Sequence, residues 1–212
     1  MRKVTDGRAR RADIKEGSSV TRSSIQAEYF DDIFASDDDP WNLASSQYEA
    51  AKFAHTHDLL ADRRYRHAFE VGCAHGVLTG YLAPLCDSLL AIDISGKALA
   101  RAQDRMGDRP GVTLAQMAFP KDAPEARSFD LVVLSEVAYY WDIVDLDRAG
   151  EWLRDNVIPT GRIILVHYTG MTDYPQSGDE AAETLWSKLK THFEVERAER
   201  AEKYRIDLWR HR

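Results

Sequence analysis

The sequence predicts an α/β fold in which helices cover both faces of a mostly parallel sheet, and three observations support this. Short apolar runs alternate with helical patterns along most of the chain. The run at 129–137 is almost continuously apolar, which is typical of a central strand buried on both faces. Two strands without an intervening helix end the chain, which indicates an antiparallel closing hairpin. We therefore expect a Rossmann-like, doubly wound sheet of seven strands with an antiparallel final strand.

Length and composition indicate one globular domain. The 212 residues are 44% hydrophobic and 30% charged. The net charge of −7 argues against nucleic acid as a partner, because phosphate binding needs a basic face. No apolar run approaches the ~20 residues of a membrane span, and no signal peptide is evident. The two cysteines lack paired metal spacing, so we expect reduced thiols in a cytoplasmic protein.

The first 24 residues differ from the rest. They carry seven Lys/Arg and three Asp/Glu, with few and unperiodic apolar residues. We expect residues 1–24 to form a flexible basic arm and residues 25–212 to form the single domain. The sequence leaves the role of the arm open, and it does not distinguish a monomer from a homodimer.

A helical segment at 25–60 precedes the first strand. Its first helix is broken by the acidic stretch that ends at Pro40. Ser45 or Ser46 is placed to cap a second helix. The residues expected on one face of that second helix are Tyr48, Ala51, Lys52, His55 and Leu59. The segment is either a lid over a ligand or a helical layer on the edge of the sheet.

The remaining chain divides into short elements of alternating type. Helices are expected at 77–85, at 96–106 behind a Ser95 cap, near 145–156 and at 178–192. Strands are expected at 68–71, 89–92, 112–117, 129–137, 162–167, 193–197 and 204–209, with a loop at 118–128 and a turn at 159–161.

One βαβ unit carries a ligand signature. Its first strand leads into a turn with Gly72 and Gly76, and its second strand ends at Asp93. The turn opens a helix, whose free N–H groups suit a polar ligand, and the acid follows Gly72 at the ~20 residues expected for a ribose-binding carboxylate. A dinucleotide fingerprint requires a glycine where Ala74 stands, which disfavours a nucleotide-binding oxidoreductase.

The turn E-V-G-C-A-H-G at 70–76 instead resembles the first motif of class I S-adenosylmethionine-dependent methyltransferases. The resemblance implies that residues 72–74 pack against the cofactor and that Asp93 binds its ribose. It also implies that Glu70 orients the turn or meets the amino group of the cofactor through water. A βαβ turn without a ligand is the plainer alternative.

Polar residues gather where the strands of the sheet are expected to end, which is where ligands bind in such folds. Glu136 follows an apolar strand and precedes Tyr139, Tyr140 and Trp141. A carboxylate beside aromatic rings suits an amine-bearing ligand, although Glu136 could instead cap a helix with the aromatics filling the core. His167 ends another strand and is either a base or a structural histidine.

Several longer stretches resemble the nodulation protein S family of methyltransferases, which act on the amine of de-N-acetylated chitooligosaccharides. They are D-P-W at 39–41, Y-E-A-A-K at 48–52, L-S-E-V-A-Y-Y at 134–140, V-H-Y at 166–168 and Y-P-Q-S-G-D-E at 174–180. The resemblance covers about residues 27–192. The family usually has leucine at Ala138 and often an acid where Met117 and Ala118 stand, which puts the adenine contact in doubt.

Carried over position by position, the resemblance implies two sets of site residues. The cofactor set is Trp41, Tyr48, Lys52, Glu70, Gly72, Cys73, Ala74, Asp93, Ile94, Met117, Ala118 and Ser135. In this set, Trp41, Tyr48 and Lys52 are implied to close over the cofactor, which makes the segment at 25–60 a helical lid. The catalytic or acceptor set is Glu136, Tyr139, Tyr140 and His167, with Tyr174 beside them.

The predicted function is therefore transfer of a methyl group from S-adenosylmethionine to an amine, of an amino sugar or another small-molecule acceptor. The activated sulfonium methyl needs no metal, and no metal-ligand spacing is present. O- or N-methylation of another small natural product is the alternative, and a non-catalytic nucleotide-binding module is a third. The acceptor, the attacking atom and the general base stay undecided at this point.

Overall fold

A computed structural model describes residues 23–125 and 128–212. Of the predicted basic arm, only Ser23 and Ser24 belong to the described residues, and the rest lies outside them.

The described chain contains one seven-stranded sheet with the strand order β3-β2-β1-β4-β5-β7-β6. The strands are β1 (Tyr65–Val71), β2 (Cys86–Asp93), β3 (Val112–Gln116), β4 (Phe129–Ser135), β5 (Val157–Tyr168), β6 (Phe193–Arg200) and β7 (Tyr204–His211). The α-helices are α1 (Ala27–Ser36), α2 (Gln47–Leu60), α3 (Val77–Leu82), α4 (Gly96–Met106), α5 (Ile143–Asn156) and α6 (Gly178–Leu189). Short 3-10 turns are η1 (Pro40–Asn42), η2 (Ala83–Leu85) and η3 (Ala138–Tyr140).

The strand directions confirm the predicted topology. β1 pairs in parallel with β2 and β4, β2 with β3, and β4 with β5. β7 runs antiparallel to both of its neighbours, β5 and β6. The order of the parallel strands reverses between β1 and β4, so the crevice expected at this switch point lies beyond their carboxyl ends.

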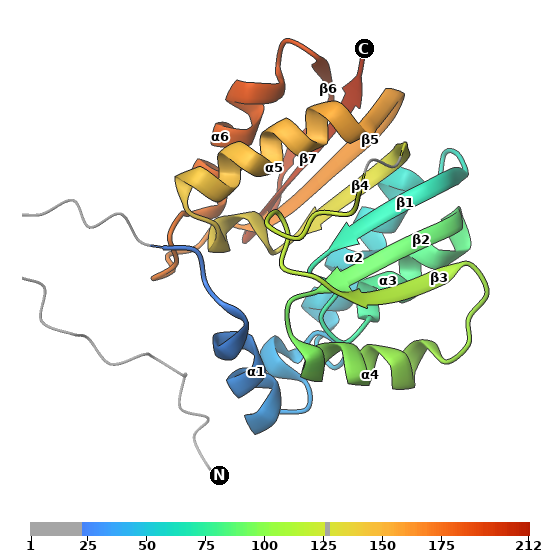
Figure 1. The fold of residues 1–212 in the computed structure, drawn as a ribbon, viewed down its shortest axis with the longest axis vertical. Helices are drawn as coiled ribbons and strands as arrows, with labels where there is room; N and C mark the ends of the chain where they lie inside the picture. Colours follow the sequence, from blue (N-terminus) through green and yellow to red (C-terminus); the bar gives the residue numbers. More distant parts are fainter. Residues whose placement is uncertain (1–22, 126–127) are drawn as a thin grey trace, which may run out of the picture.

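Helices cover both faces of the sheet and enclose two apolar layers. On one face, α5 and α6 pack on β4, β5 and β7, with Leu146, Leu153 and Leu185 fully buried (Figure 1). On the other face, α2 and α3 contribute Phe53, Leu78 and Leu82 to the second layer. Burial of these side chains supplies the main stabilisation of the fold.

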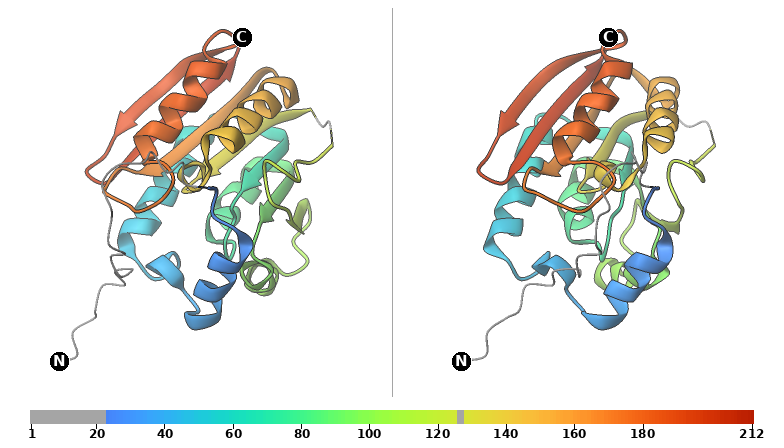
Figure 2. Two further views of the ribbon diagram at one scale, coloured as in Figure 1. Left: turned by 60° about the vertical axis from the view of Figure 1, so that its left-hand side comes forward. Right: turned by 90° about the vertical axis from the view of Figure 1, so that its left-hand side faces the viewer.

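The helical segment before β1 extends beyond the sheet. Figures 1 and 2 show α1 off the end of the strands, and α1 packs against α4. Only Phe34 of α1 is buried, while Tyr29 keeps 41% of its surface exposed. This part of the chain therefore adds little to the core. None of the described helices is long and apolar enough to cross a membrane.

Local signals set the helix starts. The Ser46 side chain accepts hydrogen bonds from the first turn of α2, and that of Ser95 does the same for α4, as the sequence predicts. Asp142 caps α5, which begins two residues earlier than expected. Ser177 and Glu180 form a capping box at α6.

Two strand boundaries differ from prediction. β4 ends at Ser135, not at 137, because Glu136 has a φ of 56° and cannot continue a strand. β5 begins at Val157, so the predicted turn at 159–161 is an irregularity inside a longer strand: Phe129 pairs with Val157, but Leu131 pairs with Arg162. The expected helix to 192 ends at Leu189.

The buried face of α2 also differs from prediction. Its buried residues are Glu49, Lys52, Phe53, Thr56 and Leu60. Only Lys52 of the predicted face is among them, and its ion-pair partner Glu49, 2.9 Å away, is buried with it. Apolar periodicity could not anticipate a face built around a charged pair.

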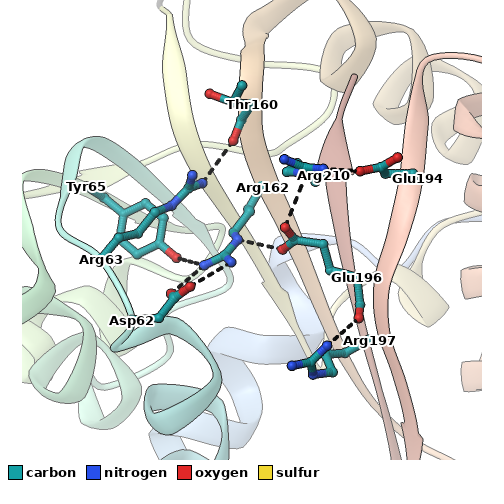
Figure 3. Close-up of polar contacts among 9 residues, drawn as sticks. All are labelled: Asp62, Arg63, Tyr65, Thr160, Arg162, Glu194, Glu196, Arg197 and Arg210. Carbon is teal, nitrogen blue, oxygen red and sulfur yellow. Dashed lines mark hydrogen bonds and ion pairs between the residues drawn. The ribbon is translucent and has the colours of Figure 1, made fainter.

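An ionic network fixes the far end of α2 (Figure 3). The guanidinium of Arg162 in β5 donates to both oxygens of Asp62, at 2.5 and 2.8 Å, just after α2 ends. It also donates to the Tyr65 hydroxyl at 3.0 Å and to Glu196 of β6 at 2.6 Å. These charge-assisted bonds join α2, β1, β5 and β6.

Candidate functional site

A cavity of about 450 Å³ lies at the carboxyl ends of the parallel strands, which is the size of a small-molecule site. The ends of β1, β2 and β4 form its floor, and α1, η1 and α2 form the opposite wall. The helical segment before β1 thus lines the cavity, and its role as a lid stays a prediction.

The glycine turn forms one side of the cavity. Gly72 has a φ of 74°, and the N–H groups of Gly72 and Cys73 both donate to the Ile92 carbonyl of β2, at 2.8 and 2.9 Å. Ala74 has a φ of 49°, a conformation that L-residues rarely adopt. The hydrogen bonds to Ile92 fix the turn, so that its backbone lies directly at the cavity surface.

Asp93 ends β2 and joins it to the glycine turn. Its Oδ2 accepts the Ala74 N–H at 2.8 Å, and its Oδ1 accepts the Ser95 N–H at 2.8 Å. Burial raises the pKa of Asp93 to about 6, although these backbone donors oppose the shift. Each oxygen can accept a further hydrogen bond from a ligand hydroxyl, as the predicted ribose contact requires.

Glu70 lines the cavity from the end of β1 and is almost fully buried, with 1% of its surface exposed. Neither carboxylate oxygen has a hydrogen bond of normal geometry among the described residues. Burial raises the pKa of Glu70 to about 8, with the nearby Thr79 hydroxyl opposing the shift. A buried acid without strong partners is suited to meet a cationic group.

A charged triad joins α2 to the end of β4. The ammonium of Lys52 lies 2.6 Å from Glu136 Oε1 and 2.9 Å from Glu49 Oε2. The two carboxylates raise the pKa of Lys52 against the opposing effect of burial. Burial also raises the pKa of Glu49. The sequence placed Lys52 and Glu136 on opposite sides of the site, but they are in direct contact.

The other oxygen of Glu136 is also held. Glu136 Oε2 accepts from the Tyr139 hydroxyl at 2.8 Å and from the Tyr168 N–H at 2.9 Å. The Glu136 N–H donates to the Val166 carbonyl at 2.7 Å. The carboxylate therefore has a fixed orientation at the cavity wall.

Aromatic rings surround the part of the cavity beyond Glu136. Tyr139 stacks on Tyr174 with ring centroids 5.4 Å apart and planes at 7°. The ring of Tyr140 packs edge-on against both of these rings, with centroids 4.6 Å apart in each pair. Phe30 of α1 packs edge-on against Tyr140, with centroids 4.9 Å apart. The predicted acceptor-side tyrosines are thus gathered in one cluster.

His167 does not line the cavity. It is fully buried behind the end of β4, and its Nε2 accepts the Ala138 N–H at 3.1 Å. Burial lowers the pKa of His167 to about 4, so the ring is neutral at physiological pH. Its position favours the structural alternative over the catalytic one.

The other predicted site residues line the same cavity. They are Trp41, Tyr48, Cys73, Ile94, Met117, Ala118 and Ser135. Trp41 has a φ of 60° in η1 and keeps 41% of its surface exposed. Met117 and Ala118 follow β3, at the position where the family often has an acid.

Sequence reasoning missed several lining residues. Phe30, Glu49 and Asp145 all line the cavity. Glu49 stands three residues before Lys52, the spacing of neighbours on one helix face, so its pairing could have been found. Nothing local indicates Asp145, which is buried and accepts from the distant Ser24 hydroxyl at 2.5 Å. Within 23–125 and 128–212, no group of three or more His, Cys, Asp or Glu could hold a metal ion.

A family model and curated relatives point to one family. The family model described as nodulation protein S (NodS) matches residues 31–166. Nodulation protein S of Sinorhizobium fredii (strain NBRC 101917 / NGR234) is 31% identical over 163 residues, which cover 76% of this chain and 75% of that protein.

A second relative matches over a shorter stretch. Nodulation protein S of Bradyrhizobium diazoefficiens is 35% identical over 116 residues, which cover 53% of this chain. The match spans about half of that relative, 54% of its length.

A solved structure shares the fold. The N-methyltransferase NodS from Bradyrhizobium japonicum WM9, in complex with S-adenosyl-L-homocysteine, superposes with a TM-score of 0.74 and 23% identity. The superposition covers 87% of this chain and 97% of that chain. This likeness confirms the class of fold predicted from the sequence.

Proposed function

The chain belongs to the nodulation protein S family, and from this premise we propose that it is an S-adenosylmethionine-dependent methyltransferase acting on an amine. One observation carries the proposal: a single cavity places the glycine turn and Asp93 on one side and Glu136 with its tyrosines on the other. The first side suits the cofactor, and the second suits an acceptor.

The residues of the first side fit the chemistry of S-adenosylmethionine. Glu70 is a buried carboxyl group without a strong partner, which suits the ammonium of the cofactor. Asp93 retains acceptor capacity for two ribose hydroxyls. Trp41, Tyr48 and the glycine turn would enclose the remaining surface.

When bound, the cofactor supplies an electrophilic methyl group on a sulfonium. The protein then has to align a neutral amine with that methyl and exclude water. Glu136 lies at the wall between the two sides, where its carboxylate can hold an incoming ammonium and accept its proton. Lys52 and Tyr139 keep that carboxylate in place.

The amine acceptor is supported by the family and by charge. The solved relative is an N-methyltransferase by its description. In this chain, the carboxylates of Glu49, Glu136 and Asp145 line the cavity together with the ammonium groups of Lys52 and Lys121. Because Asp93 adds a further acid, the lining carries an excess of acidic groups over ammonium groups, which attracts amines. An amino sugar is the acceptor that the family resemblance implies.

A different small molecule is the second candidate, and the aromatic cluster favours it, because the faces of tyrosine rings pack well against flat or apolar bodies.

Both cysteines are free and buried, which supports a reducing compartment such as the cytoplasm.

The experiment measures binding of S-adenosylmethionine and S-adenosylhomocysteine by calorimetry. Asp93→Ala should weaken both, because it removes two charge-assisted bonds of ~1.5–3 kcal/mol each before water compensates. Asp104→Ala, on the exposed face of α4, is the matched control. Unchanged affinity in a folded Asp93→Ala protein would reject the cofactor assignment.

A further inference from the structure

The cavity wall at the ends of β2 and β3 is the part expected to meet the base of the cofactor. In the strand order β3-β2-β1-β4, Glu70 stands near the end of β1 and Asp93 ends β2. We assign these two carboxyl groups to the ammonium and the ribose of the cofactor. Because the methionine arm and the base leave a ribose from opposite ends of its ring, the base then lies on the β3 side of Asp93.

The backbone of this wall is tied to Asp93. Gln116 of β3 pairs with Asp93 of β2 in the sheet. The next residue, Met117, donates its N–H to the Asp93 carbonyl at 3.1 Å, so it follows the ribose carboxylate directly along the wall. Beyond Asp93, the residues after β2 and β3 that line the cavity are Ile94, Met117, Ala118, Phe119 and Lys121.

Among the described residues of this wall, none has a side chain that readily accepts a hydrogen bond from an amine. Ile94, Ala118 and Phe119 carry hydrocarbon side chains, and the Met117 thioether is a weak acceptor. Lys121 is exposed and ends in an ammonium group, which only donates. Apolar contact with the faces of the base is therefore what these side chains offer, and the ammonium suits a ring nitrogen.

Two backbone carbonyls of the wall already accept hydrogen bonds within the protein. The Ile94 carbonyl accepts the side-chain amide of Gln116 at 3.0 Å. The Ala118 carbonyl accepts the Asp122 N–H at 2.9 Å. These bonds leave both carbonyls less available to a ligand.

The remaining polar residues of the cavity belong to other elements. Tyr168 and Thr172 lie at and after the end of β5, on the far side of β4 in the strand order. Asp145 of α5 accepts the Ser24 hydroxyl at 2.5 Å, and Gln26 donates its side-chain amide to the Ser24 carbonyl at 2.6 Å. Because none of these residues comes from the ends of β2 or β3, we do not assign them to the base.

We propose that this protein holds the base of its cofactor by apolar contact and does not recognise the exocyclic amino group of adenine. Its cofactor site then accepts purine nucleosides that lack this group. The inference rests on the proposed methyltransferase function and concerns the cofactor specificity of the same site. An amino group that meets this wall loses water without gaining a strong acceptor, so its removal costs the complex little.

The test compares two ligands of the full chain by calorimetry. One is S-adenosylhomocysteine, and the other is its deaminated analogue, in which purine replaces adenine and every ring nitrogen is kept. We expect the analogue to bind no more than about 5-fold more weakly than S-adenosylhomocysteine. A larger loss would overturn the inference, because it would show that the protein recognises the amino group. Failure of both compounds to bind would instead reject the proposed function itself.

A gain of specificity tests the position of the wall. Met117→Asp supplies a carboxylate that can accept from the amino group, so it should create a preference of at least about 10-fold for S-adenosylhomocysteine over the analogue. Ala118→Asp is the second variant, in case the first does not fold. Thr113→Asp adds the same charge at an exposed position of β3 and should leave the ratio unchanged. If neither variant at the wall gains a preference while folded by circular dichroism, the wall does not face the amino group and the inference is wrong.

Discussion

The Lys52 ammonium lies 2.6 Å from a carboxylate oxygen of Glu136, and this ion pair joins helix α2 to the end of the central strand β4. Only 3% of the Lys52 side chain and 21% of the Glu136 side chain are exposed. The pair therefore ties the position of α2 to the orientation of the carboxylate that we assign to the acceptor.

Glu136→Gln keeps the shape of the side chain and removes its charge. Turnover on an amine should fall ~10²–10⁴-fold if Glu136 accepts the proton, with little change in cofactor affinity. If Glu136 only orients the amine, the loss is smaller and the pH profile keeps its shape. Steady-state kinetics across pH distinguish the two, with the exposed Glu151→Gln as control. Full activity at every pH would remove Glu136 from the site.

Lys52→Met removes the charge that the two carboxylates share. Because the buried Glu49 and the partly buried Glu136 would both lose their cation, the free energy of unfolding should drop by up to about 3–5 kcal/mol. Urea denaturation measures it. Adding Glu49→Gln to Lys52→Met should recover part of the loss, and a double variant no more stable than Lys52→Met would contradict the shared-charge account.

Glu70 should release a proton when the cofactor product binds. Its pKa is raised to about 8 by burial, so near pH 7 the free protein holds that proton. A cationic ammonium beside the carboxyl group favours the charged form and lowers the pKa. The enthalpy of S-adenosylhomocysteine binding should therefore depend on the ionisation enthalpy of the buffer. The dependence should vanish in Glu70→Gln; if it persists unchanged, the proton comes from elsewhere.

Protonation of His167 should destabilise the fold. Its pKa is lowered to about 4 by burial, below the ~6.5 of an unfolded chain, so the unfolded state takes up the proton first. The contribution of the neutral His167 ring to the free energy of unfolding is fully present above pH ~6.5, and it is lost as the pH falls from there through about 4. It amounts to about 3 kcal/mol by linkage. His167→Gln should show a shallower fall in stability over this range than His57→Gln, a more exposed control, and equal slopes would contradict the assignment.

The sequence revealed the parts of the site that are local. The glycine turn and Asp93 belong to one βαβ unit, and their spacing alone indicates a nucleoside-type ligand. The doubly wound topology and the antiparallel β7 followed from the alternation of elements. Such features depend on neighbours along the chain, so a single sequence contains the necessary information.

Contacts between distant segments could not be predicted in this way. Lys52 and Glu136 are 84 residues apart, and Ser24 and Asp145 are 121 residues apart. Periodicity assigns each residue to a face but does not say which charge it meets across the fold. His167 shows the same limit: it ends a strand at the correct edge, yet its ring lies behind the cavity wall.

The Arg162 network of Figure 3 has a consequence for how ligands leave the protein. Asp62 holds the chain just after α2, and Lys52 holds the helix nearer its start, so α2 is pinned at two points. Most residues of the segment at 27–44 are instead exposed or half-buried. We therefore expect the segment at 27–44 to move when ligands enter or leave the cavity. Replacing it with the corresponding segment of a relative should change the acceptor preference without altering the sheet.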